Sequence, residues 1–441
     1  MRYIVLVLGM TATLAAEERG PLSLSLKRAV EIATSQEGST PIQLSAESLR
    51  QAELRSKEAR AALLPDLQGV FSYENRTANL AAMGISLTRL PFPGFEFPTF
   101  VGPFLTMDAR ASVTQSVFDV SSIRKFQASK VGVSAARSDS ESASEQVAAV
   151  VARAYLGAVR ADTDVETAQA NVMLSQAVLR QAENQKNAGT GTGIEITRAR
   201  VQLANDQQRL LVTENARRAA HLQLMRAMGV RLDTEVQLTD GLRYVAVDAL
   251  TLENARAQAL RDRPDYKAQQ EREANARLMA SATVMERLPS LAAFGDYGSS
   301  GSAFSNSLPT RTYGISLKVP LWDGARRDAR RAESASQHRA EAIRTNDVRE
   351  QIELDVRLAL DALSSAQDEV KVAKDGLDLA ESELEQARRR YQAGISDSLE
   401  VTDAQTRLER ARDNQTAALF NYNVARIDLA QAMGVVRRTI Q

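Results

Sequence analysis

The sequence contains no cysteine and only two histidines. The lack of cysteine excludes disulfides, thiolate metal ligands and a lipid-bearing cysteine at the start of the exported chain. His221 and His338 have no other ligand types near them in sequence, so we expect both at the surface and expect no metal or other cofactor. No nucleophile–base arrangement can be defended, and we therefore expect that the protein is not an enzyme.

Net charge and long apolar runs are also missing. The chain has 55 basic and 55 acidic residues, with no basic block, so nucleic acid is not an expected partner. No apolar run reaches the roughly twenty residues that a membrane-spanning helix needs, and any membrane segment would have to be built from strands. The start of the chain, where Arg2 precedes an apolar run from Tyr3 to Leu14 and then Ala15-Ala16, is typical of a signal peptide over residues 1–16. The alternative is a cytosolic chain with an apolar first strand.

Proline is absent between Asp119 and Pro264 and again after Pro320, so nothing interrupts a helix in either stretch. Apolar residues there recur alternately four and three positions apart, for example from Ile352 to Tyr391. This period of 3.5 residues keeps one stripe facing a partner helix and is typical of coiled-coil packing. A helix over 122–188 would be about 100 Å long at ~1.5 Å per residue.

The helical pattern occurs twice with a fixed offset of 205 residues, which relates Gly189 to Gly394 and Gly229 to Gly434. An ungapped duplication of this length predicts two structurally equivalent repeats. After the signal peptide the first repeat covers 17–230 and the second 231–441. Each is expected to hold short helices, a β-hairpin and a long helix pair, with the hairpins at about 65–118 and 289–322 and the helix pairs at about 122–228 and 324–433.

Alternating apolar and polar residues predict four strands per chain. The clear cases are 67–77, 106–118 and 312–319, and 290–299 is weaker because Phe294 breaks the alternation. Such strands fit either a soluble half-buried sheet or the wall of a β-barrel. The barrel is favoured, because the predicted signal peptide directs the chain to export and no apolar run is long enough for a membrane-spanning helix. Because a small open sheet leaves unpaired edges, we expect a homotrimer in which three copies of four strands give about twelve strands around one lumen.

Taken together, the pattern resembles the TolC-like outer-membrane efflux protein family over nearly the whole chain. The matching pieces are the duplicated helix pairs, the Leu-Pro entries to the strand pairs, the motif over 319–324, and Tyr391-Gln392-Ala393-Gly394 followed by Leu399-Glu400-Val401. The resemblance implies a mainly helical protein whose trimeric α-helical tunnel continues a β-barrel in the Gram-negative outer membrane and extends into the periplasm. It implies an exit duct for small molecules or polypeptides, with a periplasmic adaptor, an inner-membrane pump and outer-membrane lipid as partners.

The resemblance also implies where such a duct closes. The helix-pair ends near Gly189 and Gly394 would dock the adaptor. Two acidic residues of the family's constriction match Glu400 and Asp403, and a link that closes the end matches Tyr391 and Glu195. A basic residue that adds a further link in the family falls at Ser396, so that link is not expected here.

Two alternatives remain open from the sequence. Glu400 and Asp403 also suit the first turn of a helix, where acids stabilise the helix dipole. The whole chain also fits a periplasmic coiled-coil adaptor or structural tether without a barrel, which would share the signal peptide and the long helices. Gly189-Thr190-Gly191-Thr192-Gly193 suggests a phosphate loop, but Ile194 breaks that motif and a hairpin turn is the better interpretation.

Overall fold

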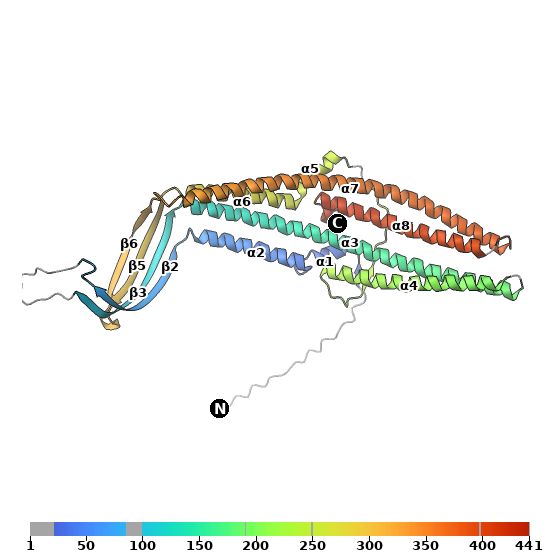
Figure 1. Ribbon diagram of the computed structural model, residues 1–441, viewed down its shortest axis with the longest axis horizontal. Helices are drawn as coiled ribbons and strands as arrows, with labels where there is room; N and C mark the ends of the chain where they lie inside the picture. Colours follow the sequence, from blue (N-terminus) through green and yellow to red (C-terminus); the bar gives the residue numbers. More distant parts are fainter. Residues whose placement is uncertain (1–21, 85–98, 190, 248–249, 397, 441) are drawn as a thin grey trace, which may run out of the picture. The chain divides into compact units, whose positions relative to one another are not determined.

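The computed structural model describes residues 22–84, 99–189, 191–247, 250–396 and 398–440 (Figure 1). The predicted signal peptide therefore lies outside the described residues, as does the segment 85–98 between the first two predicted strands. The described part is mostly helical. None of its helices is long and apolar enough to cross a membrane.

The described residues fall into two compact units, and each unit contains pieces of both predicted repeats. The first unit holds the parallel pair β1 and β4, the shorter helices α1, α5 and α9, and most of the long helices. Its elements are β1 (Leu22–Leu24), α1 (Leu26–Ala33), α4 (Gly193–Met228), β4 (Val236–Leu238), α5 (Leu252–Asp262), α8 (Ser398–Ala432), α9 (Val436–Ile440), and the parts of α3 and α7 beyond 140 and 350.

The second unit holds a four-stranded antiparallel sheet and the helices that lead to and from it. Its elements are most of α2 (Thr40–Ala61), β2 (Asp66–Asn79), β3 (Phe100–Phe118), α6 (Pro264–Met285), β5 (Ser290–Gly301), a 3-10 turn (Phe304–Asn306), β6 (Leu308–Lys318), and the first parts of α3 and α7. All four predicted strands are confirmed, including the weaker one.

The two long helices are confirmed as continuous elements. α3 runs from Val120 to Asn187 and α7 from Arg326 to Gln392. Gly132 and Gly157 lie inside α3 and do not end it. α7 begins two residues later than the predicted Gly324, because Gly324 and Ala325 take positive φ angles of 68° and 64° that a right-handed helix does not allow.

The apolar stripe with the 3.5-residue period is the buried seam of the helix pairs. In α7 it includes Ile352, Val356 and Leu363, and in α3 it includes Val147 and Val151, all of which are buried. Ser175 is a polar position in the seam of α3. It is buried, and its hydroxyl donates to the carboxylate of Asp206 on α4. The first helix pair therefore contains a buried polar contact within its apolar seam.

The sheet has the strand order β2-β3-β5-β6, so the central pair joins the two halves of the sequence. In that pair Ser112 lies opposite Asp296. β2 and β6 form the two edges of the sheet. The strands are longer than predicted around the first hairpin, because β2 continues to Asn79 and β3 begins at Phe100.

Tyr155 fixes the N-terminal strand to the helices of the first unit. Its buried hydroxyl donates to the backbone oxygen of Leu24, at 2.9 Å, and accepts from the backbone N–H of Asp240. The Asp240 carboxylate in turn accepts from the N–H of Leu26, at 2.7 Å. Burial is the main cause that raises the pKa of Tyr155 to about 12. The phenol therefore stays protonated and remains a donor at physiological pH.

Candidate functional site

The candidate gate lies where the two helix pairs turn. α3 ends before Gly189, which has a φ of 76°, and α7 ends before Gly394, which has a φ of 72°. Residues with side chains rarely adopt this conformation, and glycine ends a helix there without strain. The glycine-rich segment 189–193 thus connects two helices in a hairpin, and the interpretation as a turn is confirmed.

Tyr391 connects the second hairpin to the first. Its side chain is 4% exposed, and its hydroxyl donates to the side-chain oxygen of Gln185 near the end of α3. The ring belongs to an apolar cluster of α7 and α8 against which Leu174 and Val178 of α3 pack; the cluster is Ala380, Leu384, Ala387, Tyr391, Val401, Ala404 and Leu408. Apolar packing and the hydrogen bond between Tyr391 and Gln185 therefore join the hairpins close to their turns.

Glu195, the predicted partner of Tyr391, has a local contact of its own. It is the third residue of α4, and its carboxylate accepts from the backbone N–H of Thr192 at 3.1 Å in a capping box. Such a box stabilises a helix start because it satisfies N–H groups that have no partner within the helix. The link between Tyr391 and Glu195 stays a prediction, whereas the hydroxyl of Tyr391 donates to Gln185.

Glu400 and Asp403 follow the second turn directly, in the first two turns of α8. Glu400 is half-buried and its carboxylate lies 3.1 Å from Nε of Arg390 on α7. Asp403 is exposed. The position of Glu400 in the first turn also suits the helix dipole. Both roles assigned from the sequence are compatible with this placement, and the lining of a pore stays a prediction.

A second set of contacts between the hairpins lies farther from the turns, and sequence reasoning did not find it. Arg209 of α4 pairs with Asp413 of α8. Burial is the main cause that raises the pKa of Glu409, and the charges of Asp206 and Asp413 add to it. Asp164 on α3 likewise has a pKa raised mainly by burial. Carboxylates from three helices thus surround one bridging arginine. The sequence indicates only that Asp206 has no acidic counterpart in the second repeat, because the offset of 205 residues relates it to Ala411.

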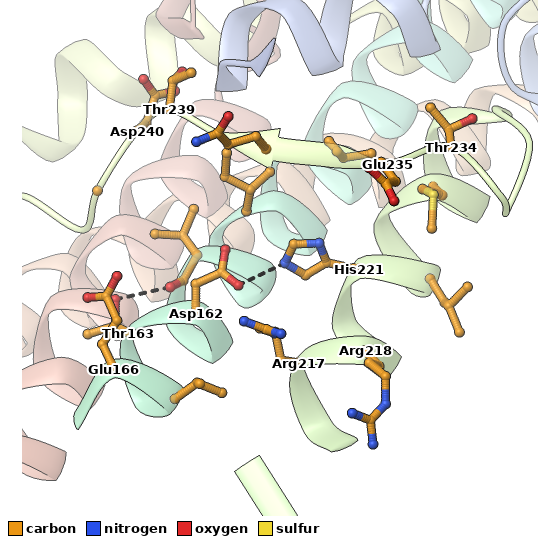
Figure 2. A pocket seen from close by; sticks show the side chains of 18 of the residues that line it. Asp162, Thr163, Glu166, Arg217, Arg218, His221, Thr234, Glu235, Thr239 and Asp240 are labelled. Carbon is orange, nitrogen blue, oxygen red and sulfur yellow. Dashed lines mark hydrogen bonds and ion pairs between the residues drawn. The ribbon is translucent and has the colours of Figure 1, made fainter. Parts of the chain in front are cut away.

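A cavity of about 1170 Å³ lies in the first unit between α3, α4 and β4. Figure 2 shows side chains that line it. His221 lies in it, half-buried, with a ring nitrogen 2.9 Å from the carboxylate of Asp162. The expectation of an isolated surface histidine is therefore wrong for His221, because α4 places it opposite an acid of α3 that is 59 residues away in sequence. Within the described residues no group of three or more potential ligands could hold a metal ion.

Comparison with known proteins gives the family. The model of the outer membrane efflux protein family matches residues 34–230 and 255–435. The chain belongs to this family of transport proteins, and its function is that of an exit duct for efflux or secretion in the outer membrane, extending into the periplasm. Membership of this family contradicts the alternative that the chain is a periplasmic adaptor or structural tether.

Three similar proteins illustrate the range of the family. The chain is 25% identical over 420 residues to the pyoverdine export outer membrane protein OpmQ of Pseudomonas putida, covering 93% of this chain and 86% of OpmQ. It is 26% identical over 392 residues to the alkaline protease secretion protein AprF of Pseudomonas aeruginosa, covering 86% of this chain and 78% of AprF. The crystal structure of the outer membrane channel CmeC of Campylobacter jejuni has the same fold, with a TM-score of 0.79 at 15% identity, covering 93% of this chain and 85% of CmeC.

Proposed function

We propose that three copies of the chain close one barrel of about twelve strands in the outer membrane, since each copy supplies four. The observation that carries this proposal is the sheet with two open edges, β2 and β6. A membrane offers no water to satisfy unpaired backbone N–H and C=O groups, so the edges must pair with other strands. Edge pairing between copies satisfies them all.

The side chains of the sheet support a wall between lipid and water. Apolar residues are exposed on both edge strands, among them Phe71 at 60% and Ile315 at 73%. Arg110 on β3 lies between Asp108 on its own strand and Asp296 on β5, at 3.3 Å from the latter. Apolar side chains toward lipid and paired charges toward a lumen are the arrangement of membrane β-barrels.

The long helix pairs would continue the barrel as a tunnel built from two repeats per chain, residues 17–230 and 231–441, once the signal peptide over 1–16 is removed. In this proposal Glu400 and Asp403 from three chains surround the narrowest part of the tunnel. Rings of carboxylates attract cations. Tyr391, which donates to Gln185, and Glu195, its predicted partner in the adjoining hairpin, would hold the tunnel closed.

The partners and the cargo follow from the same proposal. The hairpin ends near Gly189 and Gly394 would dock a periplasmic adaptor that joins the duct to an inner-membrane pump. The relatives are named for export of pyoverdine and of a protease, which supports a duct wide enough for small molecules or polypeptides. The chain would move cargo without cofactor or catalysis.

Because the chain has no cysteine, engineered cysteines test the edge pairing without background. Ser72→Cys on β2 would be combined in turn with Thr312→Cys, Gly314→Cys and Ser316→Cys on β6, and oxidised in outer membranes. At least one pair should give a covalent trimer on a non-reducing gel. Ser112→Cys with Asp296→Cys, which lie opposite each other within one sheet, is the matched control and should stay monomeric. Covalent dimers without trimers, or no crosslinks from any edge pair, would contradict the closed barrel.

A further inference from the structure

The cavity between α3, α4 and β4 contains four charged side chains without partners among the described residues. They are Arg217 and Arg218 of α4, Glu166 of α3, and Glu235 just before β4 (Figure 2). All four are exposed. Water satisfies exposed charges, so this observation becomes informative only when the two repeats are compared.

The other ionisable side chains of the cavity are already engaged. A ring nitrogen of His221 lies 2.9 Å from the carboxylate of Asp162, and the carboxylate of Asp240 accepts from the backbone N–H of Leu26 at 2.7 Å. The charges open to a further segment are therefore the two arginines and the two glutamates.

The second repeat covers the equivalent surface with its own chain. The hydroxyl of Tyr422 on α8 donates to the backbone oxygen of Val245 at 2.6 Å, and the side-chain amide of Asn423 donates to the backbone oxygen of Arg243 at 3.0 Å. The ring of Tyr422 also stacks on that of Tyr244, with the centroids 4.7 Å apart. Three contacts therefore hold the segment 243–245 against α8.

The corresponding positions of the first repeat are the arginines of the cavity. At the offset of 205 residues, Tyr422 corresponds to Arg217 and Asn423 to Arg218. The two arginines thus occupy the places from which α8 holds the segment 243–245. The first repeat has donors for a similar contact, and no segment in the described part of the chain accepts from them.

The helices α1 and α5 identify the segment that would make this contact. Ser25 caps the start of α1 and Thr251 the start of α5, each through its side-chain oxygen. Ala29 and Ala255, at the same place in the two helices, are both fully buried. These pairs define an offset of 226 residues before the strands, larger than 205 because the connection within the first strand pair is the longer one. At this offset the segment 243–247 corresponds to residues 17–21.

The strand β1 begins at the edge of the same cavity. It is parallel to β4, with Leu22 opposite Val236. Both Val236 and the preceding Glu235 line the cavity. The chain before Leu22 therefore starts beside this cavity.

We propose that residues 17–21, the start of the mature chain, fill this cavity and anchor the N-terminus to α3 and α4. Glu18, which corresponds to Tyr244, pairs with Arg217, so an ion pair takes the place of the aromatic stack in the second repeat. Arg218 donates to the backbone of the segment, as Asn423 does in the second repeat. The occupant of the cavity is thus a segment of the same chain.

The charges of the segment match those of the cavity. Glu17 and Glu18 supply two negative charges, and Arg19 with the free amine of residue 17 supplies two positive charges. The cavity offers its two arginines to the acids and its two unpaired glutamates to the cations. The amine exists only after the signal peptide is removed, so the cavity fills in the processed chain. The inference rests on the signal peptide of the proposed function.

Engineered cysteines test this contact in a chain that has none of its own. Glu18→Cys combined with Arg217→Cys should form a disulfide when the protein is oxidised in outer membranes, because a disulfide needs Cα atoms within about 7 Å of each other. The bond closes a large loop within one chain, so the denatured monomer should migrate faster on a non-reducing gel.

Glu18→Cys with Asn215→Cys is the matched control and should stay unlinked. Asn215 is an exposed residue of α4 that does not line the cavity. It lies two residues from Arg217, so its side chain points to nearly the opposite side of the helix.

Cleavage by trypsin after Arg19 provides a second measurement that leaves the segment itself unaltered. Mass spectrometry of the intact chain follows the loss of residues 17–19 from the purified protein. Arg217→Gln should accelerate this loss about fivefold, since an exposed ion pair contributes up to about that factor. Arg226→Gln removes an exposed cation of α4 outside the cavity and should leave the rate unchanged.

Three results would overturn the proposal. The cavity pair could link no better than the control pair, it could link only between chains, or Arg217→Gln could leave the rate of cleavage unchanged. The intact mass reports separately whether residues 1–16 are removed, and a chain that retains them would contradict the signal peptide itself. None of these outcomes would affect the edge-strand crosslinks, so a failure at this cavity is distinguishable from a failure of the barrel.

Discussion

The hydroxyl of Tyr391 donates to the side-chain oxygen of Gln185, so the last turn of α7 is joined to the last turns of α3. The two residues are 206 positions apart in sequence and belong to different hairpins. Any outward movement of one hairpin end relative to the other must break this contact. We therefore expect that opening of the proposed gate requires this contact to break.

Tyr391→Phe should raise the single-channel conductance in planar bilayers. The substitution removes the donor while the buried ring stays in its apolar cluster, and loss of one such hydrogen bond destabilises the closed arrangement by about 1 kcal/mol. Gln185→Ala should have a similar effect, and the double variant should add little to either single change. Equal conductance in all four proteins would contradict a gating role for this contact.

Replacing Glu400 and Asp403 together by alanine should reduce cation selectivity and weaken block by multivalent cations. The carboxylates supply the negative field that the proposed constriction would present to ions. Arg390→Ala should have the opposite effect, because it removes the guanidinium 3.1 Å from Glu400. Reversal potentials under a salt gradient measure both changes. A double-alanine channel with unchanged selectivity would leave only the helix-dipole role for these acids.

Glu409→Gln should stabilise the protein at neutral pH and lose that effect in acid. The pKa of Glu409 is raised by burial and by the charges of Asp206 and Asp413, so the folded state holds its proton up to a higher pH than the unfolded state does. Stability from this group is therefore present below the unfolded pKa and is lost as the pH rises through the folded pKa. Glutamine imitates the protonated form at every pH. Thermal melts followed by circular dichroism between about pH 4 and 8 would show the two curves converging in acid.

The control for that experiment is Glu385→Gln, which changes a strongly exposed acid paired with Arg389 on the surface of α7. An exposed pair contributes little to stability, so this variant should track the unaltered protein across the pH range. A parallel response of both variants would show that the effect is one of net charge and does not come from the cluster around Arg209.

Asp206→Ala should destabilise the first helix pair by about 1–3 kcal/mol, because the buried Ser175 hydroxyl and the amide of Gln202 lose their shared acceptor. The second repeat supplies the compensating change, since Ser175 and Asp206 correspond to Ala380 and Ala411. Asp206→Ala with Ser175→Ala should therefore recover much of the loss. Chemical denaturation in detergent measures both. A double variant less stable than the single one would mean that the two sites are not structurally equivalent.

The sequence predicted the long helices well, because the lack of proline and the 3.5-residue period act locally. Helix and seam positions such as Ile352 and Val356 follow from that pattern alone. The pairing of β3 with β5 could not be predicted in the same way, because it joins strands about 190 residues apart and depends on how the halves assemble.

The candidate site was predictable only in part. Glycine at the hairpin turns and acids after the second turn are visible in the sequence. The contacts of Tyr391 with Gln185, of Glu400 with Arg390 and of Arg209 with Asp413 are not visible there, because they depend on how one helix is rotated and offset against another. His221 shows the same limit, because Asp162 becomes its neighbour only when α3 and α4 pack together.

The most direct test of the trimeric barrel is the number of chains in the particle extracted from outer membranes, determined by native mass spectrometry. We expect that the protein requires detergent for extraction and that the particle contains three copies of the mature chain. A single chain recovered from the soluble periplasmic fraction without detergent would contradict it, and so would a detergent-extracted particle with one or two copies.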